Sequence, residues 1–150
     1  VLIEGQDIHY MKKDELVRLR KETITLIFQD LKLIPGLTVS ENITILSDKL
    51  NSKEKERLKS MMERLGISDK KDNYVSGLSY GEKQRTAIIR SLFRPFKYII
   101  MDEPFSHLDH YNKKEALKLI EEEVASNEAG LIMLSLQKEE SIDWDIQITL

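Results

Sequence analysis

A short apolar run that ends in two carboxylates constrains this chain more than any other feature. The run from Tyr98 to Met101 is continuously apolar, as is typical of a strand that is buried on both faces of a parallel sheet. Asp102 and Glu103 follow it directly. Open α/β sheets carry their chemistry at the carboxyl ends of their strands. The sequence therefore predicts an α/β fold with an acidic site at the carboxyl edge of its sheet.

A helix start precedes this run. Ser79 and Glu82 have the spacing of a capping box, in which the hydroxyl accepts an amide of the first turn and the carboxylate accepts the amide of the cap residue. Gly81 leaves the first turn without a side chain. The positive end of such a helix can bind an anion, most commonly phosphate. The two signals together indicate an anion site next to an acid pair.

These motifs resemble those of the ATP-binding-cassette (ABC) ATPases. Leu78 to Glu82 is similar to the family signature, Tyr98 to Asp102 to a Walker B strand, Glu103 to the catalytic glutamate, and Ser106 to Asp109 to the D-loop. Each motif alone is a weak signal, because a capped helix before a core strand with a solvated acidic end would look the same. Their common order and spacing make the resemblance specific.

The first 45 residues resemble one subgroup, the ATPases of lipoprotein-release and macrolide-export systems. The segments that carry this resemblance are Gly5 to Ile8, Leu19–Arg20, Ile27 to Gln29, Leu33 to Thr38 and Glu41 to Ile43. It implies that Gln29 is the Q-loop glutamine, whose amide oxygen would bind Mg²⁺ and orient a water. A lone glutamine at a strand end would otherwise be an ordinary polar terminus.

The resemblance implies roles for these residues, with ATP and Mg²⁺ as cofactors. Hydrolysis of a phosphoanhydride needs charge neutralisation, an oriented water and a base. Glu103 and Gln29 would be catalytic, and Asp102 and Gln29 would hold the metal, directly or through the nucleotide. The expected nucleotide-binding residues are Ser79, Gly81, Glu82, Asp102 and Asp109. Ser79 and Gly81 would contact the γ-phosphate of a partner's nucleotide across a dimer interface.

Two family motifs are missing from the 150 residues. None of the six glycines precedes Lys-Ser or Lys-Thr, as the P-loop pattern G-x-x-x-x-G-K-[ST] requires. We therefore expect a cassette that is truncated at its N-terminus, lacks the Walker A motif and binds ATP poorly by itself. At the position of the family's switch histidine the chain has Leu136 and Gln137. Leucine has no polar side-chain group for a γ-phosphate, so two outcomes are left open: ordinary hydrolysis, or hydrolysis that is slow or absent.

The length suits one domain, and the resemblance implies how that domain is divided. The expected fold is of the P-loop NTPase type, with a mainly parallel sheet and an inserted helical subdomain. Residues 1–30 and 96–150 would form the α/β core, and residues 31–95 the helical signature subdomain. The strands are expected at residues 1–3, 23–28, 98–101, 131–136 and 146–150, with a turn at residues 5–7.

Helical periodicity and turn residues predict the helices. One begins at Asn51 or Ser52 and ends at Gly66, and its apolar residues repeat at i, i+3, i+4 and i+7. Those residues are Leu58, Met61, Met62 and Leu65. Asp14 is expected to cap an earlier helix, and a later one is expected from Tyr111 to Val124. The signature helix is expected to stop near Pro95.

Composition limits the partners. The net charge is −3, from 23 basic and 26 acidic residues, so no polybasic surface for nucleic acid is expected. The chain has no cysteine, and no apolar run approaches the roughly 20 residues of a membrane span. The resemblance implies a cytoplasmic protein bound peripherally to the inner or plasma membrane. Its partners would be a transmembrane permease, docked on the helical subdomain at Leu31 to Ile45, and a second nucleotide-binding domain in a homo- or heterodimer.

Three functions are consistent with these features. The first is the ATP-binding and hydrolysing subunit of an ABC transporter. The second is a catalytically degenerate partner that supplies its signature, Leu78 to Glu82, to another cassette. The third is a soluble ABC protein of translation or DNA repair, which the dispersed basic residues do not favour.

Overall fold

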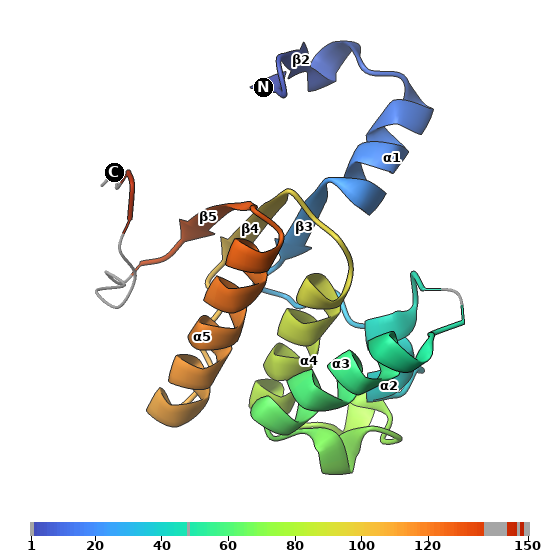
Figure 1. Ribbon diagram of the computed structural model, residues 1–150. Helices are drawn as coiled ribbons and strands as arrows, with labels where there is room; N and C mark the ends of the chain where they lie inside the picture. The colour runs from blue at the N-terminus through green and yellow to red at the C-terminus, as the bar shows by residue number, and fades with distance from the viewer. Residues whose placement is uncertain (1, 48, 137–143, 147, 149–150) are drawn as a thin grey trace.

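A three-stranded parallel sheet in the order β3–β4–β5 lies at the centre of the protein, as the computed structural model shows for residues 2–47, 49–136, 144–146 and 148 (Figure 1). Its strands are β3 (Ile24–Ile27), β4 (Tyr98–Asp102) and β5 (Gly130–Leu134). Tyr98 pairs with Ile24 on one side and with Gly130 on the other. The predicted α/β fold with a parallel sheet is confirmed.

Helices follow each of the first two strands of this sheet, and a short hairpin precedes it. The hairpin strands β1 (Leu2–Ile3) and β2 (Gln6–Asp7) are antiparallel. The α-helices are α1 (Lys13–Glu22), α2 (Val39–Thr44), α3 (Ser52–Arg64), α4 (Tyr80–Phe93) and α5 (His110–Ser126). Short 3₁₀ turns occupy Ile8–Tyr10, Ser68–Lys70 and Val75–Gly77.

Local side-chain chemistry explains where the helices begin and end. Asn51, rather than Ser52, caps α3, because its side chain accepts the amide of Glu54 and the Glu54 carboxylate accepts the amide of Asn51. Gly66 follows α3 with a φ of +61°, as a C-cap glycine does. The predicted cap at Asp14 is wrong, since α1 begins at Lys13 and the Glu15 carboxylate accepts the amide of Lys12.

The core forms where the helices meet one face of the sheet. The periodic residues of α3 are buried as predicted: Leu58, Met61, Met62 and Leu65. They join one cluster with Ile88, Ile89 and Leu92 of α4, Leu119 and Ile120 of α5, and Ile99 and Met101 of β4. The expectation that β4 is buried on both faces is only half right, because Tyr98 and Ile100 on the other face are half-buried. In the described part of the chain, α4 and α5 pack on the face of Ile99 and Met101.

Several predicted strand bounds change. Residues 4 and 5 make the turn, while Gln6 and Asp7 belong to the second strand of the hairpin. β5 ends at Leu134 rather than at residue 136. Of the strand predicted at 146–150, only residues 146 and 148 are described, and neither is in a strand. Among the described residues, none of the helices combines the length and the hydrophobicity that a membrane span requires.

Arg57 of α3 bonds both the end of α4 and the side chain of Glu123 on α5. Its guanidinium donates to the carbonyls of Leu92 and Phe93 and pairs with the carboxylate of Glu123. The last carbonyls of a helix have no partner within the helix, so a donor from a neighbouring helix satisfies them. The guanidinium also lies 5.4 Å from the centre of the Phe93 ring.

We predict that Arg57→Met lowers the free energy of unfolding by about 1–3 kcal/mol, because two carbonyls lose their donor and Glu123 loses its cation. Urea unfolding followed by circular dichroism measures this change. Lys55→Met, on the exposed side of the same helix, is the control and should stay within about 0.5 kcal/mol of the wild type. Equal effects of the two substitutions would show that Arg57 does not hold α4.

Candidate functional site

The acid pair lies at the carboxyl edge of the sheet. Asp102 is the exposed last residue of β4, and Glu103 follows it with a φ of +46°. A residue other than glycine adopts this left-handed backbone at a cost, so the surrounding contacts must hold it there. The amide of Glu103 donates to the carbonyl of Leu134 at 3.0 Å, and one oxygen of its carboxylate accepts the amide of Leu136. The end of β5 therefore fixes both the backbone and the carboxylate of Glu103.

Leu136 lies where the family has its switch histidine, and it contacts Glu103 through its backbone. The side chain of Leu136 is 96% exposed, while its amide donates to the Glu103 carboxylate. Any residue other than proline could make this contact, so Leu136 supplies no titratable or hydrogen-bonding side chain here. Gln137 lies outside the described residues.

Gln84 joins α4 to the segment after β4. Its side chain is fully buried, and its amide nitrogen donates to the carbonyls of Glu103 and Pro104 at 3.3 and 2.7 Å. Its amide oxygen accepts the amide of His107 at 3.0 Å. Gln84 belongs to residues 81–85, which resemble the continuation of the family signature, but the resemblance assigned it no role. The available signal was a glutamine one helical turn before Ile88, on the apolar side of α4.

Tyr80, the first residue of α4, contacts two loops that are distant in the sequence. Its hydroxyl donates to the carbonyl of Gln29 at 2.9 Å, and its ring lies against the His107 ring with centroids 4.0 Å apart. A Cβ atom at Gly81 would lie 3.2 Å from the carbonyl oxygen of His107, so glycine permits this close approach. The expected Q-loop, signature and D-loop segments thus meet at the start of α4.

Arg90 holds the chain that follows Gln29. Its guanidinium donates to the carbonyls of Leu31 and Lys32 at 2.7 Å, and both of these residues have a positive φ. Burial lowers the pKa of Arg90, and the positive charge of Arg94 lowers it further. No local pattern indicates this contact, because it joins residues that are 58 and 59 positions apart.

The capping box predicted at the start of α4 is present. Ser79 is exposed, its hydroxyl and amide both donate to the Glu82 carboxylate at 2.8 Å, and the amide of Glu82 lies 3.3 Å from the hydroxyl. The Ser79 hydroxyl and amide hold the pKa of Glu82 below its usual range, and Lys70 contributes to this. Ser79 and Tyr80 at the start of α4 are exposed, while Gly81 and Glu82 are half-buried.

Asp109 caps the next helix. Its carboxylate accepts the amide of Asn112 at 2.9 Å and the Asn112 side chain at 2.6 Å. These bonds lower its pKa, chiefly the bond from the backbone amide. The structure therefore brings Gln29, Tyr80 and the residues from Glu103 to His107 together, while Asp109 is bonded within α5.

The donor set fits magnesium that arrives with a nucleotide. Among the described residues, no group of three His, Cys, Asp or Glu side chains could hold a metal ion. Mg²⁺ is usually bound by one or two carboxylates together with phosphates and waters, rather than by a cage of protein ligands. The exposed carboxylate of Asp102 and the exposed amide of Gln29 suit that mode.

The sequence is similar to those of known proteins. The family model described as ABC transporter matches residues 1–106. The macrolide export ATP-binding/permease protein MacB of Shigella flexneri is 34% identical over 121 residues, which cover 79% of this chain and 19% of MacB. The methionine import ATP-binding protein MetN of Haemophilus ducreyi is 33% identical over 142 residues, which cover 93% of this chain and 40% of MetN. The chain belongs to the ABC transporter family.

The fold also matches a solved structure, the dimeric ATP-binding cassette MJ0796 in a post-hydrolysis state bound to ADP and Pi. The TM-score is 0.74 at 22% identity, and the match covers 87% of this chain and 60% of that one. This confirms the ABC ATPase fold. The presence of MacB among the relatives agrees with the macrolide-export resemblance of the first 45 residues.

We predict that Gln84→Leu lowers the free energy of unfolding by about 1–3 kcal/mol, because three backbone groups lose their partner. Hydrogen exchange should also accelerate in residues 103–107 before it does so elsewhere in the sheet. Gln6→Leu, at an exposed glutamine of β2, is the control. Unchanged exchange at residues 103–107 would show that Gln84 does not hold this segment.

We predict that Glu82 contributes stability that depends on pH. Its folded-state pKa lies below the ordinary value of 4.5, so its contribution is fully present above pH 4.5 and is lost as the pH falls through the lowered value. The stability difference between the wild type and Glu82→Gln should therefore shrink on acidification. Urea unfolding across this range measures it, with Glu56→Gln at an exposed site of α3 as the control. A difference that does not change with pH would contradict the assignment.

Proposed function

We propose that this chain is part of the ATP-binding and hydrolysing subunit of an ABC transporter, which couples ATP hydrolysis to transport across a membrane. The main support for this proposal is that three family motifs contact one another at the start of α4. Tyr80 binds the carbonyl of Gln29, and Gln84 binds the carbonyl of Glu103. ATP-driven transport needs such a connection, because each motif must respond when the nucleotide is bound or cleaved.

The proposed chemistry uses the carboxyl edge of the sheet. Asp102 and Gln29 hold Mg²⁺, which neutralises charge on the phosphates. Glu103 acts as the base that polarises the attacking water. Its fixed backbone and the amide of Leu136 keep its carboxylate in one orientation. The isolated chain is proposed to bind ATP poorly, because it contains no P-loop sequence.

The proposed partner of the signature is a second nucleotide-binding domain. Ser79 and Tyr80 are exposed, so a γ-phosphate can reach the start of α4 from outside. Glu82 orients this turn, and Asp109 at the start of α5 belongs to the same interface. The dimeric MJ0796 cassette supports this arrangement by its likeness in fold.

The remaining parts of the proposal concern the membrane. Residues 1–30 and 96–150 form the α/β core, and residues 31–95 form a helical subdomain that docks a transmembrane permease. The protein is then peripheral on the cytoplasmic face of the membrane. The names of the two relatives point to export in one case and import in the other, so neither substrate nor direction is assigned. The relatives are transport proteins, which favours a transporter over a soluble ABC protein.

One observation favours a second candidate function, a degenerate cassette that completes the site of another. Leu136 offers only its backbone to Glu103, and its side chain cannot contact a phosphate. The capping box at Ser79 is intact at the same time. Such a chain would support hydrolysis in its partner without hydrolysing ATP in its own site.

We predict that Glu103→Gln, in the full-length protein with its membrane partner, lowers the rate of ATP hydrolysis by about 10²–10⁴-fold, because the base is lost. Release of phosphate measures the rate. Glu121→Gln, on the exposed side of α5, is the control and should leave the rate unchanged. A wild-type rate no higher than that of Glu103→Gln would overturn the first proposal and support the degenerate cassette.

A further inference from the structure

The hydroxyl of Ser79 already has a partner inside the chain. A serine hydroxyl has one proton, and Ser79 donates it to a carboxylate oxygen of Glu82 at 2.8 Å. The same oxygen accepts the amide of Ser79, also at 2.8 Å. A γ-phosphate that binds Ser79 would accept the same hydroxyl proton. Glu82 and the phosphate are therefore competitors for one donor.

The two competitors are both anions. The hydroxyl and the amide of Ser79 hold the pKa of Glu82 below its usual range, so its carboxylate is ionised at neutral pH. A negative group at the start of a helix is stabilised by the helix dipole, and here the carboxylate of Glu82 takes that place. A second anion that arrives there meets like-charge repulsion. The start of α4 thus already holds an anion that belongs to the chain.

A second partner for the carboxylate lies close by. The other carboxylate oxygen of Glu82 lies 3.8 Å from the ammonium nitrogen of Lys70, whose side chain is 33% exposed. Lys70 also pairs with Asp69 at 3.1 Å, which raises its pKa and keeps it charged. Rotation about the side-chain bonds of Glu82 can move its carboxylate from the Ser79 hydroxyl toward this cation. Arg85, one helical turn further along α4, is a second positive charge that acts on the same carboxylate.

The capping box itself is a common way to start a helix in this chain. The box at the start of α3 consists of Asn51 and Glu54, and the Glu54 carboxylate accepts the amide of Asn51 at 2.8 Å. A phosphate is expected at α4 and not at α3. The carboxylate of Glu54 therefore has the structural role of Glu82 without a ligand to compete with, which makes it a matched control.

We propose that the carboxylate of Glu82 closes the start of α4 in the unliganded chain, and that it leaves the Ser79 hydroxyl for Lys70 when a γ-phosphate binds. The inference rests on the proposed function and deepens it. Glu82 is then a positioning residue that limits how tightly the signature holds the nucleotide, rather than an additional contact to it. Glutamine at this position can keep both hydrogen bonds from Ser79, because one oxygen accepts both, but it carries no charge.

Nucleotide binding by the full-length protein with its membrane partner tests the role of Glu82. The protein carries Glu103→Gln, so that hydrolysis does not consume the ligand, and calorimetry gives the affinity for Mg-ATP. Glu82→Gln should tighten Mg-ATP binding about tenfold, because the repulsion is removed. It should not change the affinity for Mg-ADP, which lacks the γ-phosphate, and Glu54→Gln should change neither affinity. Unchanged or weaker Mg-ATP binding by Glu82→Gln would overturn the inference, as would an equal gain with Mg-ADP.

Variants of Lys70 test where the carboxylate goes. Lys70→Met should weaken Mg-ATP binding about threefold when Glu82 is present, because the released carboxylate loses its second partner. The same substitution should have no effect beside Glu82→Gln. Lys71→Met, at the exposed neighbouring lysine, is the control and should change nothing in either background. Equal effects of Lys70→Met in both backgrounds would overturn the inference, because Lys70 would then act on the phosphate directly.

Phosphate release by the same proteins with Glu103 restored separates the two levels of the proposal. A wild type that hydrolyses ATP, together with a Glu82→Gln variant that binds Mg-ATP no more tightly, would overturn the role of Glu82 and leave the proposed function standing. A full-length wild type that binds no Mg-ATP would overturn both.

Discussion

The site depends on three hydrogen bonds that the side chain of Gln84 makes. They join the signature helix to the backbone that follows the acid pair, at Glu103, Pro104 and His107. All three partners are backbone groups, and a buried backbone group without a partner is costly. One fully buried side chain therefore ties the start of α4 to the segment after the acid pair, beside the contacts of Tyr80 and Gly81 with His107. A movement of one element must carry the other with it.

α4 extends this principle to the rest of the site. Tyr80 at its start reaches the carbonyl of Gln29, Arg90 in its second half reaches the carbonyls of Leu31 and Lys32, and Arg94 after its end reaches β3. One rigid helix thus holds the loop after β3 and the loop after β4 at once. This geometry suits a protein whose binding loops must respond together.

Sequence reasoning succeeded where the physical cause is local. The cap at Ser79 depends on residues three positions apart, the buried face of α3 on a spacing of three and four, and β4 on a run of four apolar residues. It failed for the cap of α1, where Glu15 rather than Asp14 bonds the helix start, and for the second face of β4, which is only half-buried. The contacts of Tyr80 and Arg90 could not be predicted, because they join residues more than 50 positions apart.

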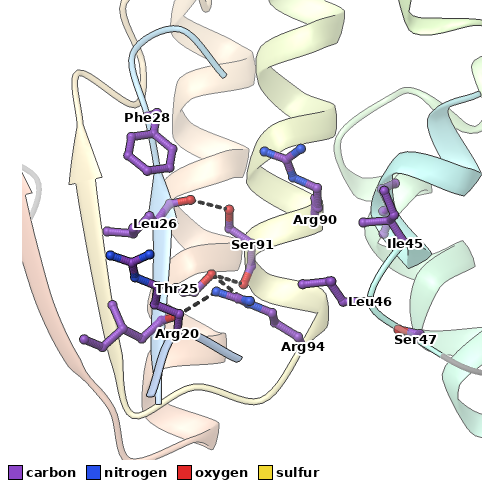
Figure 2. A pocket seen from close by; sticks show the side chains of 12 residues that line it. Arg20, Thr25, Leu26, Phe28, Ile45, Leu46, Ser47, Arg90, Ser91 and Arg94 are labelled. Atoms are coloured by element: carbon purple, nitrogen blue, oxygen red, sulfur yellow. Dashed lines mark hydrogen bonds between the residues drawn. The ribbon is translucent and has the colours of Figure 1, made fainter. Parts of the chain in front are cut away.

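The sequence by itself determined the family resemblance, the order of the elements and the acid pair at a strand end, because motifs and periodicity are properties of neighbouring residues. Only the tertiary structure decided that Gln29, Tyr80, Gln84 and Glu103 form one connected site. It also decided that Arg20, Arg90 and Arg94, which lie in α1, in α4 and directly after α4, line one pocket (Figure 2). Packing α4 against the sheet brings these distant residues together, and no local pattern encodes the distances across that contact.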